Sequence, residues 1–143
     1  MEVIKKCSFK SYDRVEVKMT SIYDLFDADT CKQIMKLVHP NQCHDNAFWI
    51  AGKLWEKGCV YCEGYLDGWM AHSFNCIDGK YFDATAEKCF EKPHKSYQLI
   101  RVFTYHEIQP VFSTLMASFF TPEGWLKRGR HYFLNNDGEL IKD

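Results

Sequence analysis

The stretch that decides the fold is residues 43–85, CHDNAFWIAGKLWEKGCVYCEGYLDGWMAHSFNCIDGKYFDAT, because the spacing of its apolar residues changes from helical to strand-like. Apolar side chains recur at positions 43, 47, 50, 51 and 54, which lie on one face of a helix and predict a helix over residues 43–57. Asn41 or Gln42 can cap its start, and Gly58 can end it in the left-handed conformation. After Gly58 the apolar residues alternate with a period of two, which indicates strands.

Two tight-turn signals predict an antiparallel meander after this helix. Asp67-Gly68 and Asp78-Gly79 each lie between strand-forming residues, which is the pattern of a two-residue hairpin loop. We therefore expect three consecutive strands, over residues 60–66, 69–77 and 80–85.

The rest of the chain is predicted from local signals. The further strands expected are residues 3–9, 14–19 and 97–105, with a polar break at residues 11–13. The further helices expected are residues 29–38, capped by Asp29 or Thr30, and residues 109–120, with Pro110 in the first turn. A short helical turn is expected at residues 121–123 and a last turn at residues 135–138. Helices packed on a mainly antiparallel sheet make a single α+β domain over residues 1–143.

The composition excludes several classes of protein. With 46% hydrophobic and 26% charged residues, the 143-residue chain is not wholly disordered. Lys+Arg minus Asp+Glu is 18 − 19 = −1, so no excess positive charge is available for a nucleic-acid backbone. The apolar runs fall far short of the roughly 20 residues that cross a bilayer, and the first residues carry no secretion signal. Seven cysteines without an export signal favour reduced thiols and a cytoplasmic location.

Cys43 is the first candidate for chemistry, because it is the first residue of the predicted helix. Backbone N–H groups in a first helical turn have no partner within the helix, and the helix dipole adds partial positive charge there. Both effects favour the thiolate, which is the nucleophilic form of cysteine, and the same N–H groups can stabilise an oxyanion. The alternative is that Cys43 is only the first buried residue of an amphipathic helix.

A nucleophilic thiol needs a base and a group that orients the base, and the turns single out His72 among six histidines. If the second loop has two residues, His72 and Asp83 are diagonal neighbours on one face of the sheet. If the first loop also has two residues, Glu63 lies directly opposite His72 on that face. A histidine held by a carboxylate is what a cysteine nucleophile requires. The alternative is a partly buried histidine with a structural hydrogen bond.

The order of these residues resembles the Cys-His-Asp core of transglutaminase-like and papain-like thiol enzymes. The matching segments are NQCHDNA at 41–47, GY at 64–65, AHSFN at 71–75 and GKYFDAT at 79–85. Small bacterial and phage proteins with the pattern C-H-x-N-A … E-G-Y … H-x-x-N … D-G … D-x-T are especially similar. The resemblance covers residues 41–85 and implies a nucleophile helix packed on a mainly antiparallel sheet.

The resemblance implies Cys43 as nucleophile, His72 as general base and acid, and Asp83 as the residue that orients the imidazole. Gln42 or Asn41 would help to form the oxyanion hole. The implied function is a cysteine-dependent amide hydrolase or acyl-transfer enzyme (a protease, deamidase or transglutaminase) that acts on a peptide or protein without a cofactor. Hydrolysis, deamidation and transamidation share one thiolate–imidazolium pair, so these residues do not choose between them.

Two alternatives belong to other functional classes. The first is a zinc-stabilised binding domain, whose ligands would be Cys59, Cys62, His72 and Cys76. A two-residue first loop argues against it, because Cys62 and His72 would then face opposite sides of the meander. The second is a non-catalytic protein-binding module on the same fold, for which the sequence offers an apolar helix face of Phe112, Leu115, Met116, Phe119 and Phe120. The histidines left without a role are His39, His44, His94 and His106.

Overall fold

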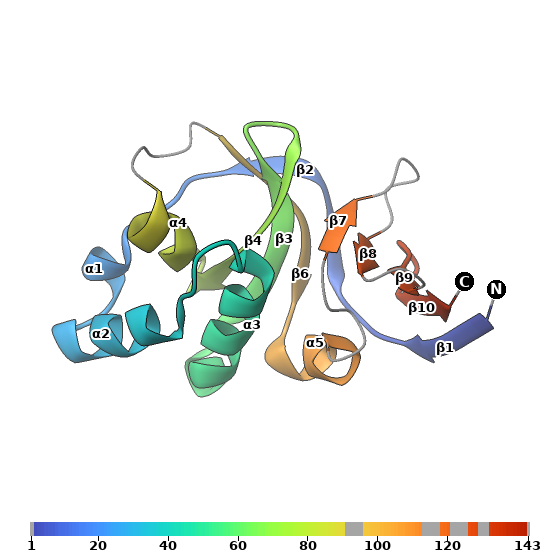
Figure 1. The fold of residues 1–143 in the computed structure, drawn as a ribbon, viewed down its shortest axis with the longest axis horizontal. Coiled ribbons are helices and arrows are strands. Elements are labelled where there is room, and N and C mark those ends of the chain that lie inside the picture. Colours follow the sequence, from blue (N-terminus) through green and yellow to red (C-terminus); the bar gives the residue numbers. More distant parts are fainter. Residues whose placement is uncertain (1, 91–95, 113–117, 121–125, 129–131, 143) are drawn as a thin grey trace.

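The computed structural model describes residues 2–90, 96–112, 118–120, 126–128 and 132–142, which form a mixed α+β chain (Figure 1). Its elements are, in chain order, β1 (Glu2–Lys6), β2 (Lys10–Val17), α1 (Ile22–Leu25), α2 (Ala28–Leu37), α3 (Cys43–Lys53), the 3-10 helix η1 (Trp55–Lys57), β3 (Val60–Leu66), β4 (Met70–Ile77), β5 (Lys80–Phe82), α4 (Ala84–Cys89), β6 (Tyr97–Phe103), α5 (Tyr105–Phe112), β7 (Ser118–Phe120), β8 (Leu126–Arg128), β9 (Tyr132–Leu134) and β10 (Glu139–Lys142).

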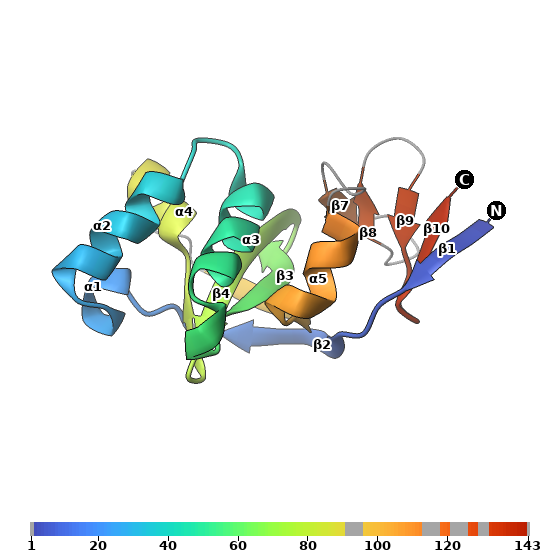
Figure 2. The ribbon, with the colours of Figure 1, turned by 90° about the horizontal axis from the view of Figure 1, so that it is seen from below.

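Within the described residues, two antiparallel sheets of five strands form the framework. The first has the order β2-β6-β3-β4-β5 and the second the order β1-β10-β9-β8-β7. Helix α3 lies over β3 and β4, helices α1, α2 and α4 gather at the β5 end, and α5 lies toward the second sheet (Figures 1 and 2). The N- and C-terminal ends lie close together because β1 pairs with β10. The α+β class predicted from the sequence is confirmed.

The main core joins α3, the first sheet and the second sheet. Its buried members come from α3, β3, β6, α5, β9 and β10: Ala47, Phe48, Ala51, Tyr61, Phe103, Ile108, Phe112, Leu134 and Leu140. Phe48 and Phe112 stack with their ring centroids 3.9 Å apart. Because strands of both sheets contribute to one cluster, hydrophobic burial holds the two sheets to the same helix.

Two further clusters cover the rest of the first sheet. The opposite face of that sheet buries Cys62, Leu66, Phe74, Tyr97 and Leu99. The helices at the β5 end pack through Ile22, Cys31, Ile34, Val38, Ile50, Leu54, Cys59, Ile77, Phe82 and Ala84. Helix α3 therefore contributes to two clusters, and this fixes its position over β4. No helix in the described part of the chain has both the length and the apolar composition that crossing a bilayer requires.

Helix α3 and the second hairpin follow the sequence prediction. Helix α3 starts at Cys43, and Gly58 ends the following turn in the left-handed conformation at φ 84°. Asp78 and Gly79 both have positive φ, as a two-residue type I′ loop requires, and Ile77 pairs with Lys80.

The first hairpin differs from the prediction by one residue. Leu66 pairs with Met70, so the exposed Trp69 is an additional residue in the loop. As a result Gly64 lies opposite His72, and the expected pairing of Glu63 with His72 is wrong. The physical reason is the apolar face: the observed register places Cys62 opposite Phe74 in one buried cluster, whereas a two-residue loop would have paired Cys62 with Ser73.

Helix α2 and the third strand of the meander differ from their predicted bounds because of the residues that cap the helices. Helix α2 starts one residue earlier than predicted, since the cap is Asp27 rather than Asp29 or Thr30 and accepts a hydrogen bond from the Thr30 N–H at 2.7 Å. The third strand of the meander is short, because Asp83 caps helix α4 through the N–H of Ala86 at 3.1 Å. The additional short helix α1 was not predicted.

The C-terminal part departs most from the prediction. Helix α5 begins at Tyr105, because Thr104 and Glu107 form a capping box with bonds of 2.8 and 3.2 Å. Pro110 therefore lies inside this helix. Residues 109–112 are helical as predicted, but residues 118–120 are strand β7, so the predicted helix does not extend to residue 120. Leu115 and Met116 of the expected apolar face lie outside the described residues. The expected turn at residues 121–123 lies outside the described residues, whereas the turn at 135–138 connects β9 to β10. The polar residues 11–13 lie inside β2, and the break expected there falls instead between Lys6 and Lys10.

Candidate active site

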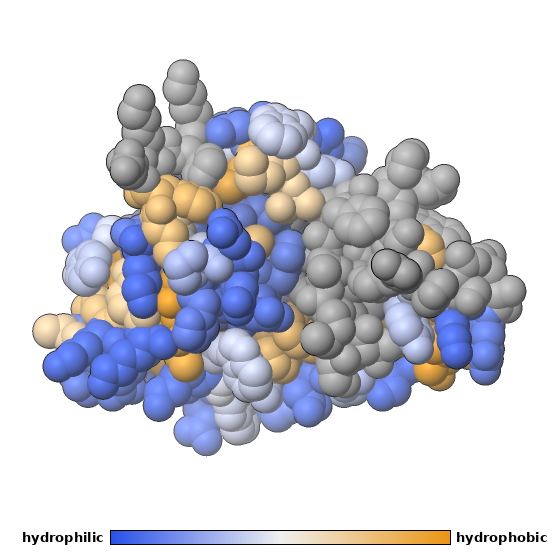
Figure 3. All heavy atoms as spheres, in the orientation of Figure 1, coloured by the Kyte–Doolittle hydropathy of each residue, from blue (hydrophilic) through white to orange (hydrophobic). Residues whose placement is uncertain are grey.

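Cys43 is partly buried at the first position of α3. Figure 3 shows the face of the molecule on which α3 lies in Figure 1. Hydrophilic residues cover this region of the face, and hydrophobic residues lie beside it over α4. The side chain of Gln42 makes no capping hydrogen bond, and its carbonyl accepts the N–H of Asn46 at 2.8 Å. First-turn N–H groups of α3 are thus not occupied by a capping side chain, and the helix dipole adds partial positive charge beside the sulfur.

Asn46 fixes the segment that leads to Cys43. Its Oδ1 accepts the N–H of His39 at 3.0 Å, and its Nδ2 donates to the His39 carbonyl at 2.9 Å and to Thr85 Oγ1 at 3.0 Å. The side chain is fully buried. One amide therefore ties the chain before α3 to the helix and ties the helix to α4, which holds the nucleophile position against the rest of the site.

His72 on β4 is held by a buried carboxylate. Its Nε2 lies 2.7 Å from Oδ2 of Asp83, and the Tyr97 hydroxyl donates to the same oxygen at 2.7 Å. His72 and Asp83 are only 2% and 4% exposed. Because Nε2 is engaged by Asp83, Nδ1 is left for the Cys43 sulfur, whose proximity is one of the causes that raise the pKa of His72. The structure thus brings Cys43, His72 and Asp83 into one chain of contacts.

The electrostatics favour a thiolate–imidazolium pair. Burial raises the pKa of the Cys43 thiol, but hydrogen bonds from His44 and His72 outweigh burial and lower this pKa to about 5. Burial lowers the pKa of His72, but the charge and hydrogen bond of Asp83 and the contact with Cys43 raise it to about 10. Burial also acts against the Asp83 carboxylate, yet the charge of His72 holds the Asp83 pKa below its usual value. At neutral pH the sulfur is therefore negative and the ring positive.

The three supporting residues predicted from the sequence, Glu63, Asn41 and Gln42, do not lie where the sequence predicted them or are exposed. Glu63 lies opposite Ser73 and accepts a hydrogen bond from the Tyr61 hydroxyl at 2.6 Å, on the face of the sheet away from His72. Glu63 therefore does not contact the His72 ring, and the prediction that it is a second carboxylate partner of that ring is wrong. Asn41 and Gln42 are both exposed, and Asn41 adopts a left-handed conformation that asparagine tolerates.

The argument from the sequence against the zinc alternative rested on a strand register that the structure changes. Cys62 and His72 lie on the same face of the meander, not on opposite faces. Nevertheless, the described residues contain no group of three or more His, Cys, Asp or Glu side chains placed to hold a metal ion. Burial raises the pKa of Cys59 to about 12 and also raises the pKa of Cys62 and Cys76, so all three are protonated thiols at neutral pH.

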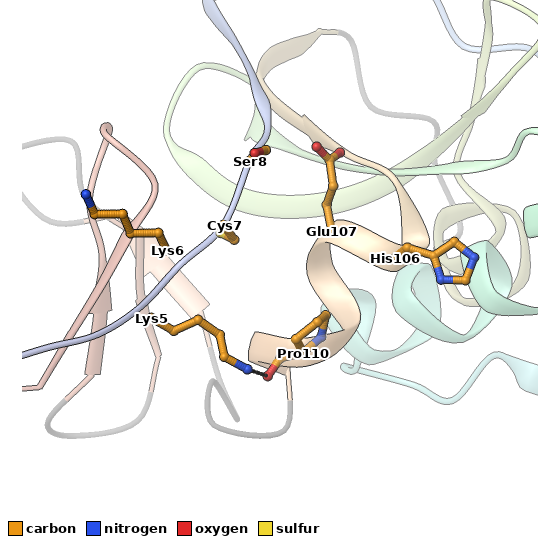
Figure 4. A pocket seen from close by; sticks show the side chains of 7 residues that line it. All are labelled: Lys5, Lys6, Cys7, Ser8, His106, Glu107 and Pro110. Carbon is orange, nitrogen blue, oxygen red and sulfur yellow. Dashed lines mark hydrogen bonds between the residues drawn. The ribbon is translucent and has the colours of Figure 1, made fainter.

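A separate pocket lies at the other end of the molecule, between the end of β1 and α5 (Figure 4). It has a volume of about 420 Å³ and is lined by Lys5, Lys6, Cys7, Ser8, His106, Glu107 and Pro110. The Lys5 ammonium donates to the Pro110 carbonyl at 3.4 Å. Burial, reinforced by Glu107 and Glu63, raises the pKa of Cys7 to about 11, so this thiol is not a nucleophile at neutral pH.

His44 is the site residue that sequence reasoning missed. Its Nδ1 hydrogen-bonds to Ser73 Oγ, and its ring also contacts the Cys43 sulfur. Only its position next to Cys43 hinted at this, because the partner Ser73 is 29 residues away in the chain. Of the other histidines without a role, His39 is held through its backbone by Asn46, His106 packs edge-on against Trp55, and His94 lies outside the described residues.

The site has the parts that nucleophilic thiol chemistry needs: a thiolate, a ring that can give and take a proton, and a carboxylate that fixes the ring. Comparison of the chain with protein-family models, with curated proteins and with solved structures finds no match. A function therefore has to follow from the geometry of Cys43, His72 and Asp83 and from the resemblance of their sequence pattern.

Proposed function

We propose that the protein is a cysteine-dependent amide hydrolase or acyl-transfer enzyme with a papain-like or transglutaminase-like core. Cys43 is the nucleophile, His72 is the general acid and base, and Asp83 orients the His72 ring. The observation that carries the proposal is the 2.7 Å contact between His72 Nε2 and Asp83 Oδ2, which leaves the other ring nitrogen for a thiol at a helix start.

In the acylation step, the Cys43 thiolate attacks the carbonyl carbon of an amide or ester. The oxyanion that forms is stabilised by N–H groups of the first turn of α3, where partial positive charge is concentrated. When the C–N or C–O bond breaks, the His72 imidazolium gives its proton to the departing nitrogen or oxygen. The products of this step are a thioester on Cys43 and a neutral His72 ring.

In the second step, neutral His72 accepts a proton from the group that attacks the thioester. Attack by water gives hydrolysis or deamidation, and attack by an amine gives a new amide. The carbon–sulfur bond breaks, and the thiolate–imidazolium pair is restored. Asp83 keeps the ring in one orientation through both steps, because its Oδ2 stays bonded to Nε2 while Nδ1 exchanges the proton.

The substrate that suits this chemistry is a peptide or protein amide. The half-buried sulfur at the surface end of α3 suits a carbonyl presented by a chain or by a side chain rather than an enclosed small molecule. Among residues close to His72, the ring of Phe90 is 6.3 Å away and the side chain is 37% exposed, so an apolar wall stands beside the reacting position.

A direct test uses an activated ester such as p-nitrophenyl acetate at neutral pH. We expect a burst of nitrophenolate equal to the enzyme concentration and an acetyl group on Cys43 in the mass spectrum. The matched control is Cys89→Ala, which removes another half-buried thiol and should leave the burst unchanged. Slow acetylation spread evenly over all cysteines, with the same result in Cys43→Ala, would contradict the proposal and favour a binding module on this fold.

A further inference from the structure

The side chain of His44 is held by residues of the sheet rather than by its own helix. Its Nδ1 hydrogen-bonds to Ser73 Oγ, which lies 3.0 Å from the Tyr61 hydroxyl, and Tyr61 donates to Glu63 Oε1 at 2.6 Å. Ser73, Tyr61 and Glu63 are all buried. His44 follows Cys43 directly in α3, and its ring is one of the groups that lower the pKa of the Cys43 thiol, so a buried polar chain runs from a neighbour of the sulfur to a carboxylate in the sheet.

The carboxylate at the end of this chain fixes the direction of every proton in it. A carboxylate oxygen only accepts, so Tyr61 gives its one proton to Glu63. Tyr61 must then accept from Ser73, and Ser73, whose one proton is used, must accept from His44 Nδ1. Neutral His44 therefore carries its proton on Nδ1 and its lone pair on Nε2, which is the nitrogen left for the sulfur.

The two faces of β4 present two different imidazoles to one sulfur. His72 and Ser73 are neighbours on β4, so their side chains point to opposite faces of the sheet. On one face His72 is paired with Asp83, and on the other Ser73 holds His44. The titratable groups that face the sulfur are thus His44 from α3 and His72 from β4, with Asp83 behind His72.

Charged groups also stand at the far end of the chain that holds His44. Glu63 on β3 pairs in register with Arg101 on β6, and both side chains are fully buried. Arg101 donates to Asn136 Oδ1, and its positive charge faces the Glu63 carboxylate. The acceptor end of the chain therefore lies beside a buried guanidinium.

The ion pair with Asp83 makes His72 a poor acceptor for the thiol proton. A ring that already carries protons on both nitrogens, one toward Asp83 and one toward the sulfur, has no lone pair to offer. Neutral His44 has one, on Nε2, because its Nδ1 proton is donated to Ser73 Oγ. The two rings thus differ in what they can do for the same sulfur.

We propose, resting on the thiol-enzyme function proposed above, that His44 is a second acid–base residue of the site, which ionises Cys43 while His72 serves the substrate. The S–H bond of Cys43 breaks, its electron pair stays on sulfur, and its proton forms a bond with His44 Nε2. Ser73, Tyr61 and Glu63 are positioning residues, because they set the tautomer of His44 without contact with the sulfur.

The test measures the rate of Cys43 alkylation by iodoacetamide against pH, with the modified residue identified by mass spectrometry. We expect His44→Gln to raise the apparent pKa of alkylation by about one unit or more. Tyr61→Phe should raise the apparent pKa as well. Without the Tyr61 hydroxyl, Ser73 can donate its own proton to His44 Nδ1, and the proton of the neutral ring then lies on Nε2. Tyr105→Phe, a partly buried tyrosine outside the chain, should leave the profile unchanged.

Nitrogen-15 NMR of the His44 ring gives a second readout that a structural role would not move. In Cys43→Ala, where no thiol proton reaches the ring, Nδ1 of neutral His44 should have the shift of a protonated ring nitrogen, and when Tyr61→Phe is added that shift should pass to Nε2. An unchanged tautomer and an unchanged alkylation profile in both His44→Gln and Tyr61→Phe would overturn the inference. If only His72→Gln moves the profile, the enzyme function stands and the role of His44 falls. If the unaltered protein already reacts like an ordinary thiol, with an apparent pKa of about 8.5, the enzyme function falls as well.

Discussion

Tyr97 and His72 bind the same oxygen: Oδ2 of Asp83 accepts the Tyr97 hydroxyl and the His72 ring, each at 2.7 Å. The other carboxylate oxygen, Oδ1, caps helix α4 through the N–H of Ala86. All three groups donate to a carboxylate that is 4% exposed, so its negative charge is compensated within the protein. Burial and the Asp83 charge in turn raise the pKa of the Tyr97 hydroxyl, which remains a donor at neutral pH.

Tyr97→Phe should weaken the site without changing the fold. The ring remains in its apolar cluster, but Asp83 loses one donor, at a cost of about 1–2 kcal/mol, and this corresponds to a rate of Cys43 acylation lower by roughly tenfold. The rate is measured with p-nitrophenyl acetate. An unchanged rate would show that Tyr97 does not support Asp83.

Asp83→Asn should be far more severe for the acylation rate. Asparagine keeps the cap of α4, since it is as good an N-cap as aspartate, but it lacks the charge that holds His72 as an imidazolium. We expect a loss on the order of 10³-fold or more in turnover, with the unfolding transition nearly retained. The matched control is Asp78→Asn, the same chemical change in the exposed loop between β4 and β5, which should leave turnover unchanged.

The pH dependence should separate alkylation from turnover. Cys43 has a pKa of about 5, so alkylation should fall as the pH drops through that value and the thiolate takes up a proton. His72 has a pKa of about 10, so turnover, which needs its proton, should also fall above pH 10, whereas alkylation should not. Alkylation and turnover that rise together with a midpoint of about 8.5 would contradict this assignment.

Asn46→Asp should misplace the nucleophile. The carboxylate has nearly the same shape but cannot donate, so the part-buried His39 carbonyl loses its donor and the buried Thr85 hydroxyl has to reverse its hydrogen bond. We expect the free energy of unfolding to fall by about 1–3 kcal/mol and the reactivity of Cys43 to fall with it. Urea unfolding and iodoacetamide labelling measure the two effects.

Asn75→Asp is the control for this prediction. Asn75 is another buried amide that donates to α3, through the Ala47 carbonyl at 2.9 Å, but it does not touch the segment before Cys43. Its variant should lose a similar amount of stability and keep the reactivity of Cys43. Equal loss of reactivity in both variants would mean that Asn46 acts through stability alone.

The sequence predicted the relation of His72 to Asp83 because it depends on a single short loop. Asp78-Gly79 permits one geometry, a two-residue turn, and the residues outside it are then placed by counting along two strands. Cys43 could be placed because the apolar spacing and Gly58 mark both ends of α3. Thr104 and Glu107 have the spacing of a capping box, which marks the start of α5. The prediction instead followed the apolar residues further along the chain and placed the helix at residues 109–120.

The position of Glu63 and the contacts of His44 could not be read in the same way. The Asp67-Gly68 signal is compatible with one additional residue, and only the burial of Cys62 against Phe74 decides the register. The contact of His44 with Ser73 joins a helix to a strand that is distant in the sequence, and no local pattern encodes such a pairing. Local chemistry thus places elements, whereas packing across the sheet selects their partners.

The additional residue in the loop before β4, Trp69, bears on how the surroundings of His72 could change in evolution. Because side chains alternate along a strand, removing one residue from this loop would exchange inward and outward positions across the whole hairpin. Glu63 would then stand where Gly64 now leaves the ring uncrowded, and the backbone of β6 could not remain in place, since a side chain at position 64 would lie 1.8 Å from the Gln98 carbonyl. An insertion or deletion at this solvent-facing tip should therefore disturb the surroundings of His72 more than a point substitution of Trp69, whose side chain is 72% exposed.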